Sequence, residues 1–248
     1  MASVAVVTSG KGGVGKSSVT AGLGAALVKR GRRVLLVDCD AGLRSLDYLL
    51  GITEQLVYDA SDIVAGNCAP LKAIYPCTHC PGLFLLPAPQ RVDYMIAPDL
   101  MREVVASLSK YFDVILTDSP AGMGRGFYAA AAPATHAFLI ATPDPVCLRD
   151  TEKIRRAVET LGIQNVRLLI NRFQLDIFRR SGFYEDLDAV IDAAGVQLLG
   201  VVPEDSEVIA AAAQGRGLSP RSRSSKAFDR IAARMDGERV PLARLEKL

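Results

Sequence analysis

Seven short runs of Val, Leu and Ile constrain the fold of this 248-residue chain more than any other feature. None of them alternates apolar with polar residues, so each predicted strand should be buried on both faces, as in a parallel sheet covered by helices. Helical patterns fall between these runs. The predicted strands are 4–8, 34–38, 83–87, 114–118, 137–143, 166–171 and 198–203. The predicted helices are 16–30, 97–110, 148–161, 184–194 and 225–235.

This alternation of strands and helices predicts the α/β fold class. We expect a single doubly wound, mostly parallel sheet of about seven to eight strands with helices on both faces. Residues 1–236 should form this domain, and residues 237–248 a short C-terminal tail. In such sheets ligands bind beyond the carboxyl ends of the strands, so the loops that follow the strands are the candidate sites.

Composition indicates the kind of core and the cellular location to expect. Half of the residues are hydrophobic and 6% are aromatic, which predicts an aliphatic core. No apolar run reaches the ~18 residues of a spanning helix, and the N-terminus lacks a signal-peptide pattern, so we expect a cytoplasmic protein. Its five cysteines are an odd number and should be reduced thiols.

Positive charge is concentrated at the C-terminal end, although the net charge is only +2. Residues 214–248 carry nine Lys or Arg and four Asp or Glu, a net charge of +5, which leaves −3 for the rest of the chain. The segment 215–226 is typical of a loop before the last helix, and we expect Ser224 or Ser225 to cap that helix.

The segment TSGKGGVGKSS, residues 8–18, has the spacing of a phosphate-binding loop. Gly10, Gly15, Lys16 and Ser17 fit G-x4-G-K-S between an apolar run and a helical pattern, which predicts a fold of the P-loop NTPase type. In this motif backbone N–H groups surround phosphate oxygens, the lysine pairs with β- and γ-phosphate, and the serine binds Mg²⁺. The alternative is a glycine-rich turn without a ligand. The pattern gives no role to the second lysine, Lys11.

Three carboxylates at strand ends are candidates for the magnesium site. Asp38, Asp40 and Asp118 follow apolar runs, and Mg²⁺ prefers oxygen ligands that bind directly or through water. A carboxylate at the end of a buried strand is costly unless it has a charged or hydrogen-bonded partner. The alternative is that these residues cap helices or form turns.

The residues after the last two predicted strands are candidates for binding the base. The Asn-Lys-x-Asp sequence typical of guanine-specific P-loop proteins does not occur, which favours adenine. Asn171 and Arg172 after the sixth strand and Pro203 after the seventh are placed to contact a purine, with the guanidinium plane and the proline ring stacking on it.

Several motifs in order along the chain resemble the ParA/MinD family of deviant Walker A ATPases. KGGVGKSS (11–18) is similar to the family's phosphate loop, in which a signature lysine precedes the glycines. Within the family the likeness is greatest to the MinD group of septum-site proteins, and it extends from residue 2 to about residue 240. It is carried by DCDAGLRSLDYLLG (38–51), VYDASDIVAG (57–66), LLPAPQ (85–90), DSPAG (118–122) and VVPED (201–205).

The resemblance implies a Mg²⁺-dependent ATPase that binds ATP as a monomer and closes into a homodimer around two nucleotides. Lys11 would then reach the partner's phosphates, Lys16 would bind phosphate within its own chain, and Asp40 would orient the attacking water. Ser17 would bind Mg²⁺ directly, and Asp38 and Asp118 through water. The ATP-binding set is Gly10, Lys11, Gly12, Gly13, Val14, Gly15, Lys16, Ser17, Ser18, Asn171, Arg172, Pro203, Glu204 and Asp205.

The resemblance also implies a spatial regulator that places the cell-division site, with a separate protein regulator or activator. Such proteins meet the inner face of the cell membrane through a C-terminal amphipathic helix. This chain departs from the family there: only Leu242, Leu245 and Leu248 share a helical face, which is little area for anionic lipid. A tail packed on the domain, or trailing from it, is the alternative.

Other functions stay open at the level of sequence. A ParA-like protein would bind DNA non-specifically through Arg216, Arg221, Arg223 and Lys226. A slow nucleotide-dependent scaffold, such as one that sets flagellar number, is a second alternative. A metal carrier is the least favoured.

The cysteines leave a further question open. Cys68, Cys77, His79 and Cys80 could bind a metal, form a redox pair or remain free thiols. Cys39 and Cys147 are expected to be small apolar core residues.

Overall fold

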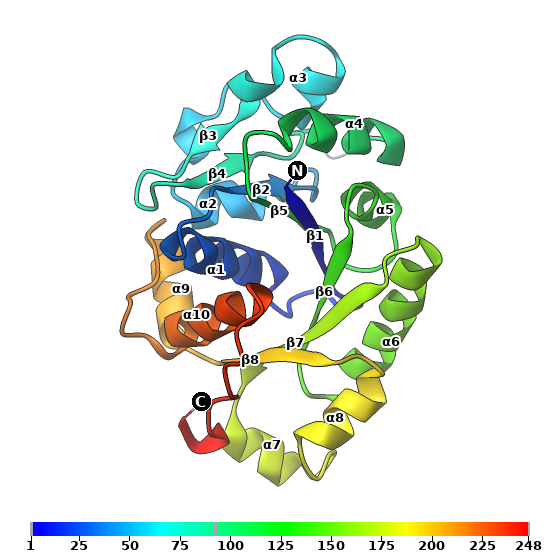
Figure 1. The fold of residues 1–248 in the computed structure, drawn as a ribbon, viewed down its shortest axis with the longest axis vertical. Coiled ribbons are helices and arrows are strands. Elements are labelled where there is room, and N and C mark those ends of the chain that lie inside the picture. The colour runs from blue at the N-terminus through cyan, green and yellow to red at the C-terminus, as the bar shows by residue number, and fades with distance from the viewer. Residues whose placement is uncertain (1, 92–93, 248) are drawn as a thin grey trace.

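A computed structural model describes residues 2–91 and 94–247 of the chain. These residues form one eight-stranded sheet with the strand order β3-β4-β2-β5-β1-β6-β7-β8 (Figure 1). The strands are β1 (Ser3–Thr8), β2 (Val34–Asp38), β3 (Tyr75–Pro76), β4 (Leu83–Leu86), β5 (Val114–Asp118), β6 (His136–Ala141), β7 (Asn165–Phe173) and β8 (Leu198–Pro203).

The mostly parallel sheet that the sequence predicted is confirmed. The seven expected strands all form and pair in parallel, because each is apolar along its length and is covered on both faces. The eighth strand, β3, is only two residues long and runs antiparallel to β4 at the sheet edge. Two residues are too few to give a periodic signal.

The helices include the five that were expected and several short ones that were not. The helices are α1 (Lys16–Lys29), α2 (Ser45–Leu49), α3 (Ala60–Val64), α4 (Pro98–Leu108), α5 (Arg125–Ala131), α6 (Pro145–Thr160), α7 (Leu175–Ser181), α8 (Leu187–Ala194), α9 (Ser206–Ala213) and α10 (Arg223–Met235). The unexpected ones, α2, α3, α5, α7 and α9, have five to eight residues. Single turns are η1 (Thr53–Gln55), η2 (Pro70–Ala73) and η3 (Leu245–Lys247).

One helix start differs from the expectation. The side chain of Ser222, not that of Ser224 or Ser225, caps α10 by accepting the backbone N–H of Ser225 at 3.1 Å. Ser224 and Ser225 are buried within the first turn. The sequence SRSS offers several possible caps, and the packing of α10 selects the earliest of these serines.

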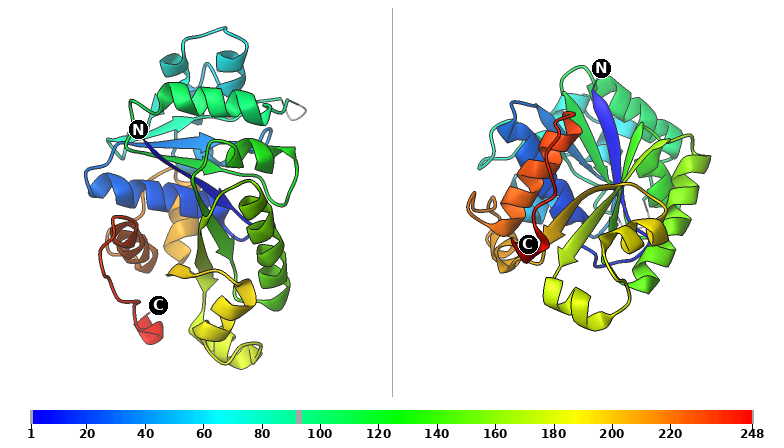
Figure 2. Two further views of the ribbon diagram at one scale, coloured as in Figure 1. Left: turned by 45° about the vertical axis from the view of Figure 1, so that its right-hand side comes forward. Right: turned by 60° about the horizontal axis from the view of Figure 1, so that its bottom comes forward.

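The helices lie in two layers around the sheet. Helices α1 and α10 pack together on one face, and α4, α5 and α6 cover the other (Figures 1 and 2). Gly22 of α1 allows close contact with α10, since a Cβ atom at this position would lie 2.3 Å from the Phe228 ring. The layers bury the aliphatic core and bring the carboxyl ends of the parallel strands to a common edge.

The tail after α10 folds back on the protein. The Arg234 guanidinium donates to the Val240 carbonyl at 2.8 Å, and Glu246 pairs with Arg179 of α7 at 3.4 Å. Leu245 packs against the core, whereas Leu242 is half exposed. The helical face expected from Leu242 and Leu245 does not form, because residues 240–244 are not helical; Leu248 lies outside the described residues.

The tail and α7 lie side by side at one end of the molecule (Figure 1). Among the described residues, every helix is too short or too polar to span a lipid bilayer.

Candidate nucleotide site

The loop between β1 and α1 depends on its glycines for its shape. Gly13 and Gly15 have φ angles of 77° and 90°, a region that side chains other than glycine disfavour. A Cβ atom at Gly15 would also lie 2.4 Å from the Asn171 amide, and one at Gly10 would lie 2.6 Å from the Asp150 backbone. The loop is therefore closely fitted between β7 and α6, with its backbone turned around the start of α1.

Lys16 is the first residue of α1 and is largely buried. Burial lowers the pKa of its ammonium group, while the negative charges of Asp118 and Asp40 raise it. It lines an open cavity together with Gly12, Gly13 and Ser17. A buried cation at a helix N-terminus, surrounded by the turns of a glycine loop, is a site suited to phosphate.

Asp38 and Asp118 face each other across neighbouring strands. They are register partners on β2 and β5, and each is 1% exposed. Burial, and for Asp38 the nearby charge of Asp118, raises the pKa of Asp38 to about 8; burial raises that of Asp118 to about 6. The sequence placed both at strand ends, but it could not show that they are adjacent.

The two carboxylates have different partners. Asp118 accepts hydrogen bonds from the hydroxyl groups of Ser17 and Thr20, the latter at 2.9 Å. Asp38 accepts the backbone N–H groups of Asp40 at 2.9 Å and Leu46 at 3.3 Å. Asp38 thereby anchors the loop that follows β2. Thr20 was not among the predicted residues, although its position one turn after Lys16 is a possible signal.

This donor set fits Mg²⁺. A hydroxyl group next to two buried carboxylates offers the oxygen ligands that the ion prefers. Because burial raises both carboxyl pKa values, and the charge of Asp118 raises that of Asp38 further, a divalent cation would favour the ionised forms. Both oxygens of Asp38 already accept backbone N–H groups, so contact through water suits this residue better than direct ligation.

Asp40 lies in the same cavity at the start of the loop after β2. It is partly exposed, and burial raises the pKa of its carboxyl group while Lys16 lowers it. Its backbone carbonyl accepts the N–H of Arg44 at 3.2 Å. The carboxylate is thus accessible to water within a fixed loop.

The residues expected to contact adenine line a second cavity beside the phosphate loop. The Asn171 amide donates to the Val14 carbonyl at 2.7 Å, so it supports the loop itself. Arg172 pairs with Glu204 at 2.7 Å and lies over the loop, donating to the Gly13 carbonyl at 3.4 Å. The cavity is lined by Gly13, Gly15, Ser18, Val19, Asn171, Arg172, Val202, Pro203, Glu204, Asp205, Val208, Ile209 and Phe228.

Asp205 has a structural partner on each side. Its carboxylate caps α9 through the N–H of Glu207 at 3.1 Å and accepts the N–H of Ser224 at 3.0 Å. It therefore ties the base-side cavity to the start of α10. The VVPED sequence placed Asp205 near the site, but it did not indicate this cap.

Lys11 is placed differently from Lys16. Its side chain is 48% exposed, and its Nζ lies 3.9 Å from Oδ1 of Asp144, the N-cap of α6. A cation this exposed is available to a group outside the chain. Asp144 is a further residue that the motifs did not indicate.

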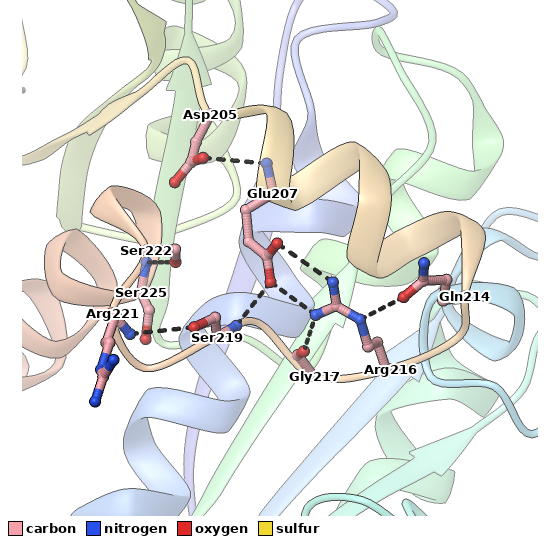
Figure 3. A network of polar contacts seen from close by, with 9 residues as sticks. All are labelled: Asp205, Glu207, Gln214, Arg216, Gly217, Ser219, Arg221, Ser222 and Ser225. Carbon is pink, nitrogen blue, oxygen red and sulfur yellow. Dashed lines mark hydrogen bonds and ion pairs between the residues drawn. The ribbon is translucent and has the colours of Figure 1, made fainter.

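The basic segment expected to contact DNA is partly used within the protein. Arg216 donates to Glu207 at 2.7 and 3.3 Å and to the Gln214 side chain at 2.6 Å (Figure 3). Glu207 also accepts the N–H of Ser219 at 3.0 Å. Arg223 donates to the Glu204 carbonyl at 2.9 Å, so two of the four basic side chains hold loops together.

In the cysteine cluster a direct side-chain contact joins Cys77 and His79. Cys77 Sγ lies 3.3 Å from His79 Nε2, and burial raises the pKa of Cys77 to about 11. Over the part of the chain that the structure describes, no group of three or more His, Cys, Asp or Glu side chains could hold a metal ion. All five cysteines are free, and Cys39 and Cys147 are buried in the core.

Curated MinD proteins are similar to this chain along nearly its whole length. The Thermotoga maritima septum site-determining protein MinD is 38% identical over 98% of this chain and 91% of its own. The Bacillus subtilis protein of the same name is 37% identical over 100% and 94%.

Solved structures of MinD proteins are also similar to this chain. The Aquifex aeolicus MinC:MinD cell division complex matches with a TM-score of 0.89 and 32% identity over 98% of this chain and 99% of that chain. Pyrococcus horikoshii MinD complexed with Mg-ADP matches with a TM-score of 0.83 and 31% identity over 95% and 96%.

These likenesses confirm the predicted P-loop fold and the prediction of a MinD-type ATPase of cell-division site placement. They also support a nucleotide and magnesium as its ligands. Residues 5–218 match the model of the CobQ/CobB/MinD/ParA nucleotide binding domain. The chain belongs to this family of nucleotide-binding proteins.

Proposed function

We propose that the protein hydrolyses MgATP and dimerises around it, and that this cycle controls where a division-site regulator acts. The observation that carries the proposal is the pair of lysines on one loop. Lys16 is buried in the phosphate cavity of its own chain, whereas the Lys11 side chain is half exposed beside Asp144. One cation serves a bound nucleotide, and the other is available to a second subunit.

Hydrolysis would depend on positioned charge. The transition state of phosphoryl transfer spreads negative charge over the phosphate oxygens, so fixed cations accelerate it. Lys16 would supply one such cation, and loop N–H groups from Gly12 to Ser18 would hold the phosphates. Bound magnesium would add Lewis-acid charge, held by Ser17 directly and by Asp38 and Asp118 through water. The half-buried Asp40 would orient the attacking water.

The partner subunit would complete the site. An exposed cation that reaches the transferring phosphate from a second chain can contribute ~10³–10⁵ in rate, as arginine fingers do elsewhere. Lys11 is proposed for this role. Three exposed apolar side chains near the same edge would be covered when two subunits meet face to face: Leu43 and Met123 on loops, and Val146 in the first turn of α6.

A protein partner is the second part of the proposal. A relative of this chain forms a complex with MinC in the Aquifex aeolicus structure, so a regulator of that kind is a candidate partner here. The described part of the tail packs back near α7, so this segment offers little free apolar surface for peripheral contact with an anionic membrane. DNA binding is less favoured because Arg216 and Arg223 have internal partners.

The test compares ATPase rates of the protein alone, with anionic vesicles and with duplex DNA. Stimulation by vesicles, with little sensitivity to salt, supports the division-site proposal. Stimulation by DNA that falls steeply with salt supports the ParA-like alternative. A turnover number per subunit that stays constant as the protein concentration rises from the monomeric range contradicts hydrolysis by a dimer.

A further inference from the structure

Two non-glycine residues in the described chain have positive φ angles, and both are arginines of the nucleotide site. Arg44 has φ 44° and ψ 59° at the start of α2, and Arg172 has φ 56°. This conformation is strained for a residue with a Cβ atom and is often retained at functional positions. Each arginine lines a cavity, Arg44 that of the phosphates and Arg172 that of the base.

The two arginines differ in how well they are paired. Arg172 is half exposed and donates to Glu204 with good geometry. The Arg44 side chain is 13% exposed, and its closest approach to a carboxylate is 3.5 Å, from Nε to Oδ2 of Asp47. Its Nε is one of three buried side-chain polar atoms without a hydrogen bond in the described residues. Such an unsatisfied donor calls for a ligand or a functional explanation.

Arg44 shares its cavity with the catalytic candidates. Lys16, Ser17 and Asp40 line the same cavity as Arg44 and Asp47. Asp47 is buried, and this burial raises the pKa of its carboxyl group, whereas the charge of Arg44 lowers it. The counter-ion of the Arg44 guanidinium is therefore the buried Asp47 carboxylate, which lies 3.5 Å away. The cavity that both residues line is suited to an anion of higher charge, such as a phosphate group.

Backbone contacts connect Arg44 to the hydrolytic residues. The N–H of Arg44 donates to the Asp40 carbonyl at 3.2 Å, and the next helix is held to Asp38 through the N–H of Leu46. A change of the strained Arg44 backbone would consequently move the carbonyl of Asp40. The conformation of the loop from Asp40 to Arg44 can thus depend on the group that occupies the cavity.

We propose that Arg44 recognises the terminal phosphate of ATP in its own chain, exchanging its loose pair with Asp47 for hydrogen bonds to phosphate oxygens. Arg44 would then distinguish ATP from ADP. This inference rests on the proposed nucleotide site and adds to it the residue that reads the third phosphate. Charge-assisted hydrogen bonds of a guanidinium to phosphate supply the selectivity.

The test measures the affinities of Arg44→Gln for a non-hydrolysable ATP analogue and for ADP, both with Mg²⁺, by calorimetry. We expect the ATP analogue to bind at least ~10-fold more weakly and ADP to bind as in the wild type. Arg44→Gly removes the backbone strain, so it should lose the same selectivity while its thermal midpoint stays equal or rises. Asp47→Asn frees the guanidinium and should raise the preference for the ATP analogue.

The control is Arg102→Gln on α4, where the arginine pairs with Asp99 at the surface, and this variant should keep the wild-type ratio. Wild-type selectivity in both Arg44 variants, or equal loss of both nucleotides, overturns the inference. The nucleotide site itself is tested separately by Lys16→Ala. If Lys16→Ala binds ATP normally, the proposed nucleotide site is wrong. If it does not bind ATP, the site is supported, and the Arg44 variants alone decide the inference about Arg44.

Discussion

Asp38 and Asp118 are register partners at the ends of β2 and β5, with both carboxyl groups buried beside the phosphate loop. Burial raises the pKa of both carboxyl groups, and the nearby charge of Asp118 raises that of Asp38 further. Neighbouring hydroxyl and N–H groups offset only part of this cost. The free protein therefore holds an arrangement that a divalent cation and its bound nucleotide would stabilise.

The first prediction concerns stability and pH. A carboxyl group whose pKa is raised on folding reduces stability as pH rises from its unfolded value near 4 to its folded value, about 6 for Asp118. Asp118→Asn should therefore gain on the order of 1–3 kcal/mol over the wild type between pH 4 and pH 6 without ligand. The gain should persist above pH 6.

Urea unfolding of the wild type and Asp118→Asn across this pH range measures the effect. The asparagine keeps an oxygen for the Thr20 hydroxyl, and the Ser17 hydroxyl can reorient to accept from its amide. Asp99→Asn at the exposed start of α4 is the control and should leave the pH profile unchanged. If the free energy of unfolding varies with pH in the same way in Asp118→Asn and the wild type, burial does not destabilise the ionised Asp118 carboxylate.

The second prediction concerns the phosphate loop. Lys16→Ala removes the buried ammonium that faces the phosphate cavity, so ATP binding should be lost in calorimetry, while Lys11→Ala should still bind ATP. Circular dichroism should report a folded protein in both cases. Equal ATP affinity in Lys16→Ala and the wild type contradicts the assignment of the loop.

The third prediction concerns the contact between α1 and α10. Gly22→Ala introduces a Cβ atom that would lie 2.3 Å from the Phe228 ring, so the variant should be less stable by about 1–3 kcal/mol despite the better helix propensity of alanine. Urea unfolding measures this loss. In the Phe228→Leu background the same substitution should be tolerated, and a loss of equal size in both backgrounds would rule out the ring contact as its cause.

The sequence predicted the sheet well because its strands are continuous apolar runs buried on both faces. Such a run can be recognised without knowing the tertiary contacts of its residues. Short elements such as α2 and α3 were missed, since five residues are too few for a helical period. The tail packs on the domain, as one of the sequence-based interpretations had it, because Arg234 and Leu245 make contacts that determine its course, and the leucines do not form a helical face.

The motifs indicate the residues of the candidate site but not their partners. Strand-end positions indicated Asp38 and Asp118, and the glycine loop indicated Lys16 and Ser17. The partners of these residues depend on tertiary structure: Asn171 supports Val14, and Asp205 caps α9. The strain at Arg44 was also hidden, because a backbone angle forced on an arginine by packing leaves no trace in composition or spacing.

The last prediction separates binding from hydrolysis. Asp40→Ala should bind MgATP but hydrolyse it slowly, because the half-buried carboxylate that would orient water is removed. Lys11→Ala should also bind ATP and fail to hydrolyse it, since the exposed cation would be missing from the partner's site. Phosphate release measured over time checks both variants, and wild-type turnover in either one removes that residue from the mechanism.

Sedimentation velocity of Asp40→Ala with MgATP and with MgADP tests ATP-dependent dimerisation most directly. We expect a dimer with MgATP, a monomer with MgADP, and a weaker dimer when Lys11→Ala is added to the same chain. A single monomeric species with both nucleotides, at concentrations where ATP is bound, would contradict it.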